Sequence, residues 1–229
     1  LIGEGVICNL NNVLGTGNVT ATSDTERAGL LVGRISKSSS AASGILAYNS
    51  SAKLTINGAE QTGEAVKAIG EGSLTYPEGV NEADVIKAFT AEQLKSGEVA
   101  YLLAEGKALV EQAWGQQLGK DQYPVPGSDY KVIKAAQGDK DANGNYTYWA
   151  TFSNQTNDVT LSVPSDRTLK VYNATVSAGK MTLAQRNGNQ VAKEEGVLLK
   201  TDGEYVNAKA NETNELAKAS SDENHLVAT

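Results

Sequence analysis

Residues 96–125 read SGEVAYLLAEGKALVEQAWGQQLGKDQYPV, and they are the only stretch with a clear helical pattern. Val99, Leu103 and Trp114 fall near one face of a helix with 3.6 residues per turn. Gly106 interrupts the apolar run, so the sequence predicts two short helices in place of one long helix. Because β patterns flank this stretch, we expect it to cover the open end of one β element, with Trp114 as a core plug.

Two capping signals precede the helical stretch. Asn81 is followed by acidic residues in what would be the first turn of a helix. Thr90 and Gln93 have the spacing of a capping box, in which each side chain bonds to the backbone of the other residue. Pro77 excludes a regular helix interior just upstream. We therefore expect a helical connector over residues 76–128.

Residues 1–75 show no helical period. Short apolar runs recur between turns rich in Gly, Ser, Thr and Asn, which indicates short strands. Two pieces look alike, Ala28–Gly33 and Ala42–Tyr48, because in both a glycine opens an apolar run and permits a close backbone approach. This pattern predicts a β-solenoid with about three coils before residue 60. An ordinary antiparallel sheet is the alternative.

Residues 129–229 return to a β pattern. Glycine turns at Ala178-Gly179, Asn187-Gly188 and Asp202-Gly203 predict hairpins between neighbouring strands. The sequence therefore predicts an antiparallel meander in a β-sandwich-like domain, followed by a polar stretch in loops, Asn211–Asn224. The predicted strands are Tyr130–Ala135, Tyr146–Phe152, Val159–Val163, Leu169–Val176, Met181–Gln185, Val197–Lys200 and Tyr205–Ala208.

The composition argues against several classes of function and site. The chain has 229 residues, 40 % of them hydrophobic, and a formal net charge of −7, so its surface repels phosphate and argues against nucleic-acid binding. Cys8 is the only cysteine and His225 the only histidine, which excludes an intrachain disulfide and a histidine-rich metal site. No apolar run is long enough to span a bilayer. The abrupt start suggests a piece of a longer protein.

Several pieces resemble parts of known bacterial surface proteins. Ala28–Gly33 and Ser43–Asn49, preceded by Asn9–Thr20, resemble the GLUG repeat, although Ile45 and Ala47 replace the expected Leu and Gly. This resemblance implies a repetitive β-helical stalk outside the cell.

The helical stretch gives a second resemblance. SGEVAYLL and WGQQLGKDQYPV are similar to a segment found after such repeats in large surface proteins of gut Bacteroidetes-type bacteria. Tyr148–Ser153 and Glu195–Lys200 resemble C-terminal β-modules of the same proteins. The resemblances imply an extracellular or outer cell-surface location, and a host or cell-surface glycan or protein as partner.

Asp139, Asp141 and Asn143 are candidate calcium ligands. With Gly144 they fit the first half of a calcium loop, Asp-x-Asp-x-Asn-Gly, in which oxygens alternate around a sharp turn. The twelfth position is Ala150 where an EF-hand has glutamate. The alternative is a solvated hairpin tip, and no other cofactor is expected.

Tyr146 and Tyr148 are candidate carbohydrate-stacking residues. Strand alternation places both on one side, with Trp149 on the other. If the tyrosine side is exposed it can stack on sugar rings; the alternative is packing against a second layer.

No catalytic residues are assigned. Cys8 and His225 lie at opposite ends of the chain, and among 27 acidic residues the sequence selects no carboxylate pair. We therefore expect a non-enzymatic structural or adhesion module of a larger bacterial surface protein. A carbohydrate-binding module and a fragment of a polysaccharide-active enzyme are the alternatives.

Overall fold

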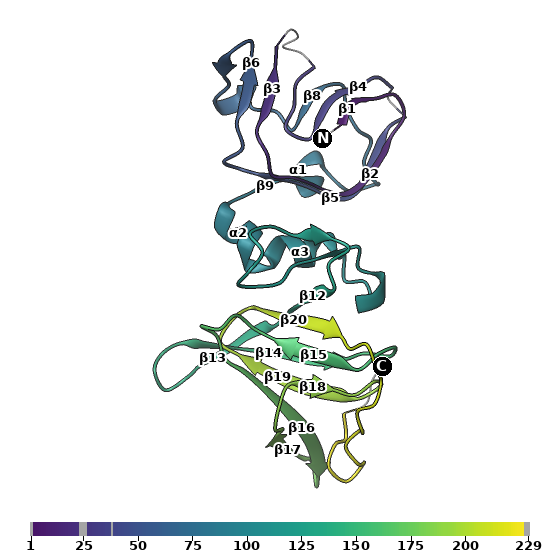
Figure 1. The fold of residues 1–229 in the computed structure, drawn as a ribbon, viewed down its shortest axis with the longest axis vertical. Coiled ribbons are helices and arrows are strands. Elements are labelled where there is room, and N and C mark those ends of the chain that lie inside the picture. The colour runs from purple at the N-terminus through teal and green to yellow at the C-terminus, as the bar shows by residue number, and fades with distance from the viewer. Residues whose placement is uncertain (1, 23–26, 38, 227–229) are drawn as a thin grey trace. The chain divides into compact units, whose positions relative to one another are not determined.

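The computed structural model describes residues 2–22, 27–37 and 39–226. The chain is mainly β with a few short helices, which confirms the predicted fold class (Figure 1). It divides into two compact units, Leu1–Leu94 and Lys95–Thr229. All of the helical stretch 96–125 therefore belongs to the second unit.

The first unit is a β-solenoid whose coils pair through parallel strands. Its sheets have the orders β1-β4-β8, β2-β5-β9 and β3-β6-β7. Among the described strands of this unit, the β6–β7 pair is antiparallel and the other pairs are parallel. The strands are β1 (Ile2–Gly5), β2 (Asn9–Gly15), β3 (Val19–Ala21), β4 (Val32–Ile35), β5 (Ala41–Asn49), β6 (Leu54–Ile56), β7 (Ala59–Glu60), β8 (Ile69–Glu71) and β9 (Ile86–Phe89), with a 3₁₀ turn at Gly63–Ala65.

Each face of the solenoid contributes side chains to its interior. Val32, Leu46 and Leu54 come from different sheets, and each is fully buried. The coils therefore close around an apolar interior, as stacked repeats do. The third coil, formed by β8 and β9, comes after residue 60, so the prediction of about three coils before that point is wrong.

The two similar pieces are not equivalent positions in successive coils. Val32 pairs with Ile2 and Ile69, whereas Leu46 pairs with Val13 and Ile86, so the pieces lie on two faces of one coil. The close approach expected at the glycine that opens each run is confirmed for Gly29, where a Cβ would lie 2.5 Å from the backbone nitrogen of Gly70. Two further glycines are packed as closely. A Cβ on Gly33 would lie 2.5 Å from the carbonyl oxygen of Gly3, and a Cβ on Gly70 would lie 2.5 Å from that of Gly33.

The capping box is confirmed. The Thr90 N–H donates to Oε1 of Gln93 at 3.0 Å, and the Gln93 N–H donates to Oγ1 of Thr90 at 3.2 Å. This box begins α2 (Ala91–Ser96), which follows the shorter α1 (Glu82–Val85). At α1 the Asn81 N–H donates to Asp84 at 3.0 Å.

The helical stretch forms only one of its two predicted helices. That helix is α3 (Glu98–Leu103), which lies against β10 (Trp114–Gly115) and β12 (Tyr130–Lys134) and buries Val99 and Leu103. After Gly106 the chain makes only a 3₁₀ turn, Leu109–Glu111, before β10 pairs with β11 (Val125–Pro126). Trp114 is half-buried at the start of β10, so its prediction as a core plug is wrong.

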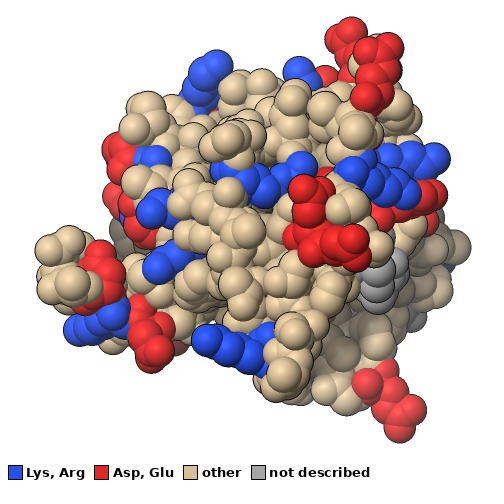
Figure 2. Space-filling view, turned by 90° about the horizontal axis from the view of Figure 1, so that it is seen from below, with Lys and Arg blue, Asp and Glu red and all other residues tan. Residues whose placement is uncertain are grey.

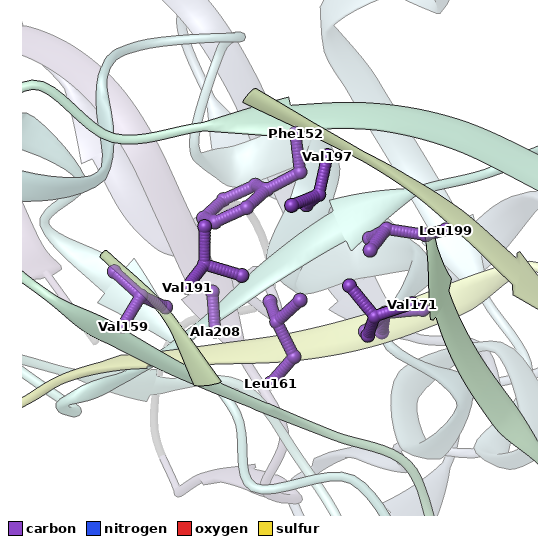
Figure 3. Close-up of a cluster of buried hydrophobic side chains, with 9 residues drawn as sticks. Phe152, Val159, Leu161, Val171, Val191, Val197, Leu199 and Ala208 are labelled. Carbon is purple, nitrogen blue, oxygen red and sulfur yellow. The ribbon is translucent and has the colours of Figure 1, made fainter. Parts of the chain in front are cut away.

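The second unit is a β-sandwich of two antiparallel sheets. Their orders are β12-β20-β15-β18 and β13-β14-β19-β16-β17. Phe152, Val171 and Leu199 of one sheet face Val159 and Leu161 of the other, and these side chains point toward one another in the core (Figure 3). The strands are β13 (Ala136–Lys140), β14 (Tyr146–Ser153), β15 (Val159–Ser162), β16 (Leu169–Ser177), β17 (Lys180–Gln185), β18 (Gln190–Val191), β19 (Gly196–Thr201) and β20 (Tyr205–Ala210).

The predicted meander is only partly correct. Ala178-Gly179 does join the hairpin β16–β17. Asn187-Gly188 and Asp202-Gly203 instead carry the chain from one sheet to the other, because β18 pairs with β15 and β20 pairs with β12 and β15. The sheets are antiparallel, but their strand order does not follow the sequence.

Candidate functional site

A cleft of about 640 Å³ opens in the second unit, where β14, β19 and β16 lie side by side. This volume lies within the range of about 300–1,000 Å³ that is usual for small-ligand sites. Residues from the β13–β14 hairpin, from β14, β16 and β19, and from the turns next to β16 and β19 line it. They are Asp141, Gly144, Asn145, Tyr146, Thr147, Tyr148, Arg167, Thr168, Lys170, Lys200, Thr201 and Asp202.

Both sequence-predicted tyrosines line this cleft. Tyr146 is 45 % exposed, and Lys140 Nζ lies 4.8 Å from the centre of its ring. Tyr148 is half-buried and pairs with the buried Thr201 across β14 and β19. The cleft thus has one open and one partly covered aromatic side chain.

Three cations line the same cleft. Among the described residues, no carboxylate lies within 4.0 Å of the charged nitrogens of Arg167, Lys170 or Lys200. Arg167 Nη1 donates to the carbonyl oxygen of Asp202 at 2.9 Å, which fixes the side chain without neutralising its charge. No local pattern in the sequence predicts this grouping, because the pairing of β16 with β19 creates it.

The two carboxylates of the cleft already accept hydrogen bonds within the chain. Asp202 accepts from the N–H and from Oγ1 of Thr168, each at 2.9 Å. Asp141 Oδ1 accepts from the N–H groups of Asn143 and Asn145, each at 2.9 Å. These neutral donors leave both carboxylates charged, so the three cations exceed the two carboxylates of the cleft by one positive charge.

Of the candidate calcium ligands, Asp141 and Asn143 lie in the tip of the β13–β14 hairpin, and Asp139 lies near the end of β13. The Asp141 side chain accepts the two hydrogen bonds given above. The Asp141 carbonyl also accepts one, from the Gly144 N–H at 3.0 Å, which closes the turn. The Asp139 carbonyl accepts from Thr147 Oγ1 at 2.8 Å. Within residues 2–22, 27–37 and 39–226, no three His, Cys, Asp or Glu side chains gather as a metal-binding group.

Trp149 lies on the sheet face opposite Tyr148 and Phe152, as strand alternation requires. Its ring is 6.1 Å from that of Tyr172, and Lys200 Nζ lies 5.0 Å from its centre. Gly138 on β13 leaves room for the indole, because a Cβ there would lie 2.9 Å from Cδ1 of Trp149. The Trp149–Tyr172 pair joins strands separated by β19, and sequence reasoning missed it.

Buried carboxylates lie away from the cleft and hold loops. Asp158 is 1 % exposed and accepts from the N–H groups of Leu216 at 2.8 Å and Lys193 at 2.7 Å. These backbone hydrogen bonds hold the pKa of Asp158 below its usual value. Glu195 lies 2.8 Å from Arg186 and accepts from the Ala219 N–H at 3.1 Å. Both acids thereby anchor the polar C-terminal stretch, which lies in loops as predicted.

Cys8 and His225 belong to different units. The Cys8 N–H donates to Oγ of Ser40 at 3.2 Å, and the thiol is partly buried against the solenoid core. His225 Nδ1 accepts from the Val176 N–H at 2.8 Å, and the His225 N–H donates to the Ala174 carbonyl at 2.7 Å. The histidine thus extends the hydrogen bonding of one edge of β16.

The surface carries both charge signs. Figure 2 shows a face on which Lys and Arg are interspersed with Asp and Glu. None of the described helices is long and apolar enough to cross a membrane. A comparison with protein families, with curated proteins and with solved structures finds no match to this chain.

Proposed function

We propose that this chain is a non-enzymatic structural or adhesion module of a larger bacterial protein at the outer cell surface. The observation that supports this role is the construction of both units from β layers. Parallel coils stacked around buried Val32, Leu46 and Leu54 form a rigid spacer, and the sandwich presents an open cleft.

Surface proteolysis tests the proposed location. Protease added to intact cells of the producing organism should remove the protein, while a cytoplasmic marker protein survives. Retention of the protein under those conditions would contradict a surface role. Incubation with a polysaccharide panel tests the absence of enzyme activity, because new reducing ends would show a hydrolase.

A second candidate function is carbohydrate binding at the cleft. Tyr146 and Tyr148 support it, because they lie in one cleft and Tyr146 is well exposed. Tyrosine rings offer sugars an apolar face and a hydroxyl for hydrogen bonding. The sheet holds in place the strands that carry the lining residues. The cleft is therefore largely formed before a ligand binds.

A glycan array with matched variants tests this second function. Tyr146→Ala should reduce the signal of every bound saccharide by roughly tenfold, since a lost aromatic contact costs about 1–1.5 kcal/mol. Tyr123→Ala is the control, because Tyr123 is 39 % exposed and lies outside the cleft. A blank array for the unaltered chain would leave adhesion through a protein partner as the better account.

A further inference from the structure

We propose that the cleft selects anionic saccharides, with a sugar carboxylate or sulfate ester bound by Arg167, Lys170 and Lys200. This inference rests on the second proposed function and adds the class of ligand. It starts from charge: the chain has a net charge of −7, yet these cations meet in one cleft without an ion-pair partner among the described residues.

The pairing of the strands brings these cations together. Lys170 and Lys200 are directly opposite each other on β16 and β19, so their side chains leave the same face of the sheet. Like charges in such a cross-strand pair destabilise the fold, and an anion between them would relieve that repulsion. Lys200 is also held near Trp149, which restricts where its ammonium group can lie.

Arg167 adds a fixed donor next to this pair. Its Nη1 bond to the Asp202 carbonyl anchors the guanidinium at the end of β19, and its remaining N–H groups stay available. A guanidinium bonds well to planar carboxylates and to sulfate-like groups through two parallel hydrogen bonds. Among the described residues, the Asp202 carboxylate forms no ion pair with it, and its two oxygens accept from Thr168.

The remaining lining suits a sugar better than a bare anion. Tyr146 and Tyr148 also line the cleft, but they leave β14 on the face opposite to Lys200, whose cross-strand partner is Trp149. The hydroxyl groups of Thr147 and Thr168 already donate within the chain. Each of these threonine oxygens keeps lone pairs that can accept a sugar hydroxyl. Cations and hydroxyl acceptors together match an acidic saccharide.

Calorimetry on the full chain tests the inference with matched probes. They are tetragalacturonic acid, its methyl ester, a sulfated chondroitin tetrasaccharide and neutral cellotetraose. We expect one of the two anionic probes to bind at least tenfold more tightly than cellotetraose, and more weakly as salt is raised. If the cleft binds the sugar carboxylate, the methyl ester should bind at least tenfold more weakly than tetragalacturonic acid. If it binds the sulfate ester, the chondroitin probe alone should bind.

Charge variants complete the test. Lys170→Gln and Lys200→Gln should each weaken binding of the anionic probe roughly tenfold. Lys209→Gln is the control, because Lys209 also lies over an aromatic ring, 5.3 Å from the centre of Tyr130, but outside the cleft. Circular dichroism should show that all three variants keep the fold.

The outcomes separate the two proposals. Equal binding of charged and neutral probes, or unchanged affinity in both charge variants, overturns the anionic inference and leaves carbohydrate binding standing. No binding of any saccharide on the array or in the calorimeter overturns carbohydrate binding together with this inference. Tight binding of a phosphorylated peptide in place of the saccharides would also overturn the inference.

Discussion

Three charged residues form a ladder along one face of the solenoid. Arg34 lies in register between Glu4 and Glu71, at 3.4 Å from the first and 3.0 Å from the second. All three side chains are partly exposed, so each pair contributes about 0–1 kcal/mol. Their alternating signs still favour one register, because a slip of one coil position would remove both contacts.

Gly33 should tolerate no side chain. A Cβ there would lie 2.5 Å and 2.6 Å from the carbonyl oxygens of Gly3 and Arg27, and backbone oxygens have little room to move. We expect Gly33→Ala to lower the free energy of unfolding by about 3 kcal/mol. Urea unfolding measures this, with Gly17→Ala as the control because a Cβ at Gly17 meets nothing within 4 Å. Equal stability of the two variants would contradict the coil contact.

Asp158 should make stability depend on pH. Its folded pKa is lowered by backbone hydrogen bonds from Leu216 and Lys193, so it stabilises the fold above its unfolded pKa of about 3.9. That contribution is lost as pH falls through the folded pKa. Asp158→Asn should therefore lower the melting temperature at pH 7, and the difference from the unaltered chain should shrink at pH 3.

Asp166→Asn is the matched control for this prediction, because Asp166 lies exposed on a turn. Its melting temperature should follow the unaltered chain at both pH values. The Asp158→Asn variant and the unaltered chain could instead differ in melting temperature by the same amount at pH 7 and pH 3. That result would show that the carboxylate charge is not what holds the C-terminal stretch.

Strand positions could be predicted from the sequence better than strand partners. The apolar runs of β14 and β16 and the turn at Ala178-Gly179 are local signals, and all are found in the structure. Asn187-Gly188 shows only that the chain turns. Which strand comes next depends on how the two sheets bury their core, and no local pattern reports that.

The same limit applies to the cleft. Tyr146 and Tyr148 could be found because they lie two residues apart on one strand. Arg167 and Lys200 come from distant parts of the chain, and only the pairing of β16 with β19 brings them near. For Trp114 the local pattern itself misled. A helical pattern predicted a core position for this residue, but it lies in the short strand β10.

Asn207 on β20 connects the sandwich to the segment after β10. Its side chain is 2 % exposed, accepts from the Leu118 N–H at 2.8 Å, and donates to the Gln116 carbonyl at 2.7 Å. Asn207→Ala would leave these buried groups without partners, which should cost about 3 kcal/mol in thermal or urea unfolding. Gln190→Ala on the exposed face of β18 is the control and should cost little. An Asn207→Ala variant as stable as the unaltered chain would mean that water replaces the side-chain amide.

The two units have separate cores, and this decides how the whole molecule should respond to damage. Buried Val32 and Leu46 belong to one cluster of the first unit, and Phe152 and Leu199 to the core of the second. The cleft lies wholly in the second unit. A fault in a solenoid coil should therefore leave the cleft intact.

A fragment of residues 90–229 tests this independence. It starts at Thr90 because α2 (Ala91–Ser96) crosses the boundary between the units, and the Thr90–Gln93 capping box begins that helix. We expect the fragment to unfold in one cooperative transition and to bind the same saccharides as the full chain. The Gly33→Ala variant of the full chain should likewise keep its affinity while its first unit unfolds earlier. A fragment that folds but binds nothing would show that the first unit supplies part of the site, whereas one without a cooperative transition would show that the sandwich needs the solenoid to fold.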